Sequence, residues 1–111
     1  MKTQVPDMKL PELLCPACDS EYITYNAVHI FNRKEDAKYG HHVTVYDGEI
    51  HQDGYMTDNP SPRRGGIRLK FYCEMCGGSF YLVLAQHKGT TQVLWEKCQN
   101  QYTHYRLVGK A

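Results

Sequence analysis

The chain has 111 residues, of which 41% are hydrophobic and 23% are charged, and its formal net charge is +1. This composition is typical of one globular domain and excludes a fully disordered chain, a histone-like basic binder and an acidic tail protein. No apolar run approaches the roughly 18 residues of a transmembrane helix, and the first ten residues lack the apolar core of a secretory signal. We therefore expect a cytoplasmic protein with no membrane partner, whose five cysteines are reduced.

The polar, proline-interrupted segment 1–14 predicts a flexible N-terminal lead-in. Residues 15–108 predict a single β domain, because apolar and polar residues alternate and no stretch shows a helical period. The alternation predicts strands at 21–32, 41–46, 49–52, 67–72, 80–86 and 90–98, with a further edge strand inside 99–108.

Two details of these segments can be compared with the structure. The loop 53–66, with two prolines and three glycines, is the longest and is expected to be the least rigid part. Near alternation along 21–32 predicts that its odd-numbered positions share one face of the sheet. These positions are Ile23, Tyr25, Ala27, His29 and Phe31.

The clearest motifs are the cysteine pairs CPAC at 15–18 and CEMC at 73–76. Two cysteines separated by two residues place both thiols on one tight turn, and two such turns supply four soft ligands for a tetrahedral Zn²⁺. Gly77 and Gly78 follow the second pair and permit the positive φ that such a turn needs. The expected metal ligands are Cys15, Cys18, Cys73 and Cys76.

The spacer between the pairs, residues 19–72, has 54 residues, whereas simple two-knuckle sites use about 15–20. Its strands can still fold back and bring the pairs together. Four cysteine ligands leave no open position for water, so one structural zinc per chain is expected. Two alternatives stay open: reduced cysteines that bind no metal, and C-x-x-C redox pairs.

Paired knuckles joined to antiparallel strands resemble the zinc-ribbon group. The segment IRLKFYCEMCGGSFYLVLAQHKGTTQVLW, residues 67–95, is similar to small uncharacterised zinc-ribbon proteins of bacterial and phage or plasmid type. The resemblance covers roughly residues 15–95 and implies a small all-β antiparallel sheet, an elaborated zinc ribbon with the four cysteines as ligands, but no particular activity. Ribbons of transcription-elongation factors carry adjacent Asp-Glu at a hairpin tip. Here that tip reads His87-Lys88-Gly89, so this role is not implied.

A local excess of basic residues lies in 59–72, which contains four cations and no acid. Cations for phosphates beside aromatics for base stacking are typical of a surface that binds DNA or RNA. The residues predicted to contact nucleic acid are Arg63, Arg64, Arg68, Lys70, Tyr72 and Lys88. Alternatively, the acidic segment 47–58 neutralises this region and leaves a solvated charged surface.

Nine tyrosines and the open edges of a sheet favour a second class of function, a protein-interaction module such as an adaptor, an inhibitor or a homodimer. No acid–base pair, nucleophile motif or phosphate-binding loop occurs, so neither an enzyme nor a small-molecule substrate is expected. Cys98 is expected to be a small packed residue. The six histidines are expected to be solvated or hydrogen-bonded, and a weak second metal site at His51 is the alternative.

Overall fold

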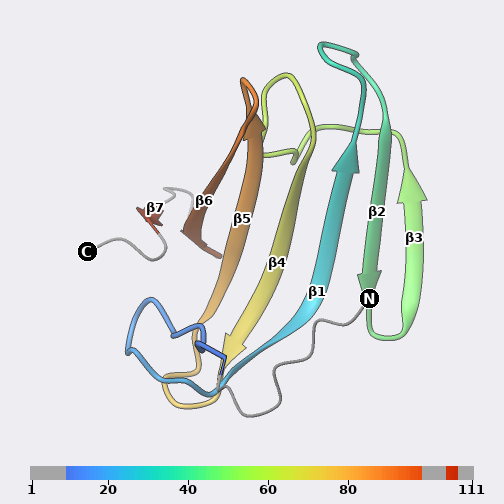
Figure 1. Ribbon diagram of the computed structural model, residues 1–111. Coiled ribbons are helices and arrows are strands. Elements are labelled where there is room, and N and C mark those ends of the chain that lie inside the picture. Colours follow the sequence, from blue (N-terminus) through green and yellow to red (C-terminus); the bar gives the residue numbers. More distant parts are fainter. Residues whose placement is uncertain (1–9, 99–104, 108–111) are drawn as a thin grey trace, which may run out of the picture.

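The computed structural model describes residues 10–98 and 105–107, and this part of the chain contains no helix. Seven strands form one antiparallel sheet in the order β3-β2-β1-β4-β5-β6-β7 (Figure 1). The predicted all-β antiparallel fold is therefore confirmed, and no bilayer-spanning helix occurs in the described part. The strands are β1 (Ile23–Asn32), β2 (His41–Tyr46), β3 (Glu49–Asp53), β4 (Gly66–Cys73), β5 (Ser79–His87), β6 (Thr90–Lys97) and β7 (Tyr105–Leu107).

The first six strands begin and end within two residues of their predicted bounds. The strand expected inside 99–108 corresponds to β7, which pairs with β6. Most of the predicted lead-in, residues 1–9, and the parts 99–104 and 108 of the predicted domain lie outside the described residues.

The predicted face of β1 is wrong, because a β-bulge interrupts the strand. Tyr25 pairs with Phe71 on β4, and Ala27 pairs with Lys70, so Asn26 is the extra residue. A bulge shifts the alternation by one position. Ile23 and Tyr25 therefore share a face with Val28, whereas Ala27, His29 and Phe31 lie on the opposite face.

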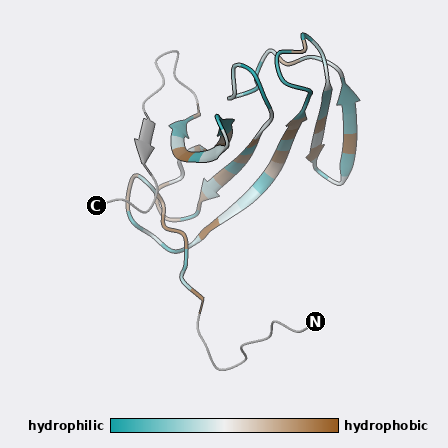
Figure 2. Cartoon of the chain, turned by 45° about the horizontal axis from the view of Figure 1, so that its top comes forward, coloured by the Kyte–Doolittle hydropathy of each residue, from teal (hydrophilic) through white to brown (hydrophobic). Residues whose placement is uncertain are grey.

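The register gives the sheet two different faces. The apolar face carries mostly aliphatic and aromatic residues, and the polar face carries the charged and hydroxyl-bearing ones. Figure 2 shows the result as hydrophobic bands alternating with hydrophilic ones along the strands. The apolar face includes Ile23, Tyr25, Val28, Ile30, Val43, Val45, Ile50, Ile67, Leu69, Phe71, Phe80, Leu82, Leu84, Val93 and Trp95.

Each face is covered at only one end by described residues. On the apolar face, Phe80 and Trp95 are buried beside Cys15 and Cys73, at the end where the cysteine pairs lie. On the polar face, the loop 54–65 covers the opposite end, where Phe31 and Val83 are 2% and 3% exposed. The strands contact only their neighbours in the sheet, so the described fold is a single layer.

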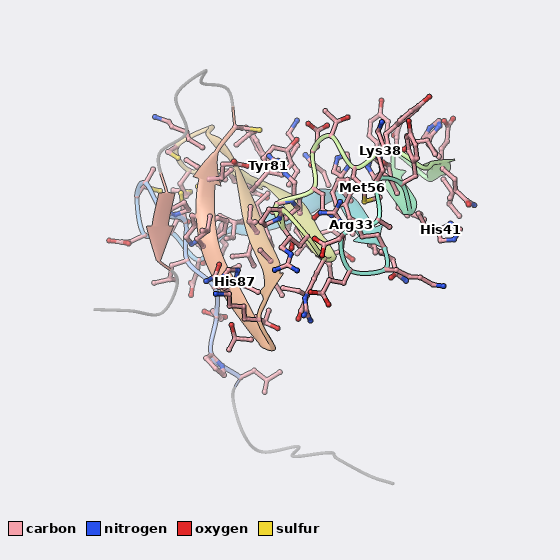
Figure 3. All side chains as sticks on the ribbon, turned by 90° about the horizontal axis from the view of Figure 1, so that it is seen from above. Arg33, Lys38, His41, Met56, Tyr81 and His87 are labelled. Carbon is pink, nitrogen blue, oxygen red and sulfur yellow. The ribbon has the colours of Figure 1, made fainter. Side chains whose placement is uncertain are left out.

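Specific hydrogen bonds anchor the loop 54–65, although its composition predicted the least rigid part of the chain. Buried Ser61 donates through Oγ to the Gln86 carbonyl at 2.8 Å and accepts the Arg64 N–H at 2.9 Å. The Arg33 guanidinium donates to three carbonyls, those of Ala37, Ser61 and Arg64. Figure 3 shows Arg33 beside this loop. Hydrogen bonds thus hold this loop to the sheet, although it is rich in proline and glycine.

Candidate metal centre

The two cysteine pairs form turns with matching backbone hydrogen bonds. In the first, the Cys15 N–H donates to the Ser20 carbonyl and the Cys15 carbonyl accepts the Asp19 N–H. In the second, Cys73 forms the same two bonds with Gly78 and Gly77. The residue after each second cysteine has positive φ, 64° at Asp19 and 73° at Gly77. The sequence predicted this conformation for Gly77, whereas Asp19 adopts it without being glycine.

These turns bring the four predicted ligands together at the lower end of the sheet in Figure 1. Cys15 Sγ lies 3.8 Å from Cys76 Sγ, and Cys18 Sγ lies 3.6 Å from Cys73 Sγ. All four sulfurs lie within 4.8 Å of one another. A tetrahedral Zn²⁺ with bonds of about 2.3 Å separates its sulfurs by roughly 3.8 Å. The spacing therefore fits a metal ion and is far longer than the roughly 2.05 Å of a disulfide.

Local electrostatics favour a cation between these sulfurs. The backbone N–H of Cys76 donates to the Cys73 sulfur at 3.5 Å and lowers the pKa of that thiol to about 7. The Ser20 N–H acts in the same direction on Cys18, but reduced hydration of its sulfur inside the cluster and the three neighbouring thiols outweigh it and raise the pKa of Cys18 to about 12. Four clustered thiols cannot all ionise alone, and a divalent cation removes this repulsion.

The site is built as part of the core. Cys15 and Cys73 are fully buried, whereas Cys18 and Cys76 are exposed at the surface. Leu13, at the end of the predicted lead-in, packs against the same cluster. Among the described residues, the four cysteines are the one group of His, Cys, Asp or Glu side chains whose ligand atoms converge. The chain therefore contains a tetra-cysteine site compatible with a zinc-ribbon-like metal centre.

No family model, no curated protein and no solved structure matches this chain.

The residues predicted to contact nucleic acid fall into two separate groups. Arg63, Arg64 and Lys88 lie at the end of the sheet opposite the metal centre, around a small cleft. The other three, Arg68, Lys70 and Tyr72, lie along β4 and point to the polar face. The structure thus does not gather the six residues into one surface, and nucleic-acid contact stays a prediction.

Acidic partners engage the three arginines of this set. Arg63 pairs with Asp36 at 2.7 Å and with Glu35 at 2.9 Å, and Arg64 pairs with Glu35 at 3.1 Å. Arg68 pairs with Glu96, which is buried on the polar face. The segment 47–58, expected to supply the neutralising acids, supplies none to these arginines in the described ion pairs. By contrast, Lys70 and Lys88 take part in none of the ion pairs among the described residues.

Sequence reasoning missed a hydrogen-bonded cluster of histidines on the polar face. His42 contacts Asp53 through Nδ1 at 3.1 Å, and its Nε2 lies 3.2 Å from both His29 Nδ1 and Thr44 Oγ. Burial, with His42 as the next cause, lowers the pKa of His29. Three strands supply this cluster, so spacing within one segment does not reveal it. His51 pairs across the sheet with Thr44, and its ring nitrogen contacts Glu49 at 3.3 Å.

Proposed function

We propose that this chain is a non-enzymatic binding module, held together by one structural Zn²⁺, whose polar face contacts single-stranded nucleic acid or a complex that processes it. The geometry of the four sulfurs supports the structural metal. A tetrahedral set of four cysteine thiolates is typical of structural zinc sites. A closed set of four thiolates offers no position for substrate, which favours a role in folding over catalysis.

The observation that supports nucleic-acid contact is the surroundings of Lys70. This lysine has no carboxylate partner among the described ion pairs and lies on β4 between Ala27 and Tyr81. In the same row on β2, Tyr46 is 52% exposed, and Tyr72 on β4 is 42% exposed. Exposed rings beside a free cation are the elements of a stacking surface for single strands. The Tyr81 ring is less accessible, because the Arg68 guanidinium lies 4.3 Å from its centroid.

The test is a fluorescence-anisotropy titration of zinc-loaded protein with labelled single- and double-stranded DNA and RNA, at low and at physiological salt. We expect single strands to bind, and the affinity to fall as salt rises. The variants Lys70→Ala and Tyr72→Ala should each weaken binding, with the stacked ring contributing about 1–3 kcal/mol. The double variant Arg63→Ala/Arg64→Ala is the matched control. The two guanidinium groups that it removes are paired with Glu35 and Asp36 in the wild type, so binding should change little. Absence of binding at low salt would contradict the proposal.

A further inference from the structure

Most of the apolar face has no covering layer among the described residues. Away from the metal centre, every aliphatic side chain on this face is partly or largely accessible, up to 66% for Ile50. On the polar face at the same level, Phe31 and Val83 are buried. Globular domains generally bury such a surface against a second layer. The side chains concerned are Val28, Ile30, Val43, Val45, Ile50, Ile67, Leu69, Leu84 and Val93.

This surface is almost free of charge. From β3 to β6, the one Asp, Glu, Lys or Arg directed to the apolar face is Lys97, at the metal end. Uncharged polar and histidine side chains border the opposite end of the face. They are Asn32, His41, Gln52, Gln86 and Thr91. A cleft of about 440 Å³ opens at that border, between Ile30, Ile67 and Leu84 and the charged residues Arg33, Glu35 and Arg64. An apolar centre with a polar border is the arrangement found in protein–protein interfaces.

We propose that a second copy of this chain covers the apolar face, apolar face against apolar face, in a two-fold symmetric pair of stacked sheets. A two-fold interface places the same patch on both partners, so the patch must be self-complementary. An uncharged aliphatic surface meets this condition, because pairing it with itself buries no unmatched charge. The strand residues of this part of the face carry no charge, so they offer no cation to bind the phosphates of nucleic acid and no opposite charge to bind a charged peptide.

The size of the face is sufficient for such a pair. The six strands β3 to β6 in sheet order, at about 4.8 Å spacing, give a width of about 29 Å, and five residues at about 3.3 Å give a length of about 17 Å. Two copies therefore bury at least about 1,000 Å² of projected area, which reaches the lower limit for a specific interface. Zinc with four thiolates changes the formal charge from +1 to about −1, so repulsion between copies is small. Sheets stacked in this way form a β-sandwich with a shared core.

The test is sedimentation equilibrium of the full-length, zinc-loaded chain over a wide range of concentrations. We expect a reversible transition from 12.8 kDa to twice that mass. The variants Ile30→Lys and Val45→Lys alter positions that are 40% and 39% exposed, so the lysine stays solvated in the single copy. Each should weaken association at least about 100-fold, since pairing would bury an unmatched charge. The control Gln92→Lys adds the same charge at an exposed position on the polar face of β6 and should leave association unchanged.

Circular dichroism and zinc content establish that each variant is folded, and Ile50→Lys, at a 66% exposed position, replaces any variant that is not. A single copy at all concentrations would overturn the proposal. If the apolar-face variants and Gln92→Lys all dimerise as strongly as the wild type, the proposal is also overturned. That result would favour pairing through the edge of β3. This inference does not depend on nucleic-acid binding, which concerns the opposite face, and failure of one leaves the other intact.

Discussion

Loss of one metal ligand, as in Cys18→Ser, is expected to abolish cooperative folding. Of the eight apolar residues that are buried in the described chain, four form the cluster around the metal centre: Cys15, Cys73, Phe80 and Trp95. A structural zinc contributes an apparent free energy of about 10–16 kcal/mol, whereas a domain of this size is stable by about 5–15 kcal/mol in total. We therefore expect the metal contribution to equal the whole stability, and the sheet to unfold when the ion is lost.

The assay is a thermal melt followed by circular dichroism, with the bound zinc of each sample measured in parallel. Cys18→Ser and the chelated wild-type protein should both lose the cooperative transition. Cys98→Ser is the matched control: this thiol is half-buried and lies outside the metal-binding group. It should retain one zinc and a melt close to that of the wild type. An unchanged melt for protein shown to be metal-free would refute the reasoning.

Three further predictions concern the sheet. Because burial and a neighbouring histidine lower the pKa of His29 below its ordinary value of 6.5, the unfolded chain binds a proton that the folded chain does not, so stability falls as pH drops through about 6.5. Urea unfolding of His29→Gln should show a smaller loss between about pH 7.5 and 5 than the wild type. Ser61→Ala removes the buried hydroxyl that donates to the Gln86 carbonyl and should cost about 1–3 kcal/mol in the same assay. Gly66→Ala places a Cβ 2.5 Å from Pro60 Cγ and should destabilise the protein by about 1–3 kcal/mol.

Each of these predictions has an outcome that would contradict it. A pH profile of His29→Gln that is parallel to the wild type would show that this imidazole is not the group responsible. Ser61→Ala at full stability would mean that the loop 54–65 does not depend on this hydroxyl. Gly66→Ala at full stability would mean that Pro60 and the Leu84 carbonyl oxygen, 2.5 Å and 2.9 Å from the added Cβ, move away without cost.

Much of the fold follows from local patterns in the sequence. Alternation in segments such as IRLKFY sets strand bounds because each strand of this sheet has two unlike faces. The C-x-x-C spacing alone identified the residues that the structure gathers into one site, because the spacing fixes the knuckle turn independently of the spacer length.

Features that depend on pairing between distant segments could not be predicted. The bulge at Asn26 arises from the register of β1 against β4, and alternation along β1 does not reveal it. Arg63 lies 27 residues from Asp36, and no local pattern joins them. The same holds for His42, whose partners lie on β1 and β3 as well as on its own strand. Local charge counts therefore overstated how much of the arginine-rich segment is available to a ligand.

The position of the two knuckles has a consequence for how the chain is made. Cys15 and Cys18 leave the ribosome 54 intervening residues before Cys73, a delay of roughly 3–11 s at 5–20 residues per second. During that interval β1 can pair with β2, and β2 with β3, but β4, the other neighbour of β1 in the sheet, has not yet been made. The first two thiols can hold a metal ion only as a half-site until the second knuckle emerges. Metal binding by all four cysteines and pairing of β1 with β4 therefore become possible at the same stage, once the second knuckle has been made.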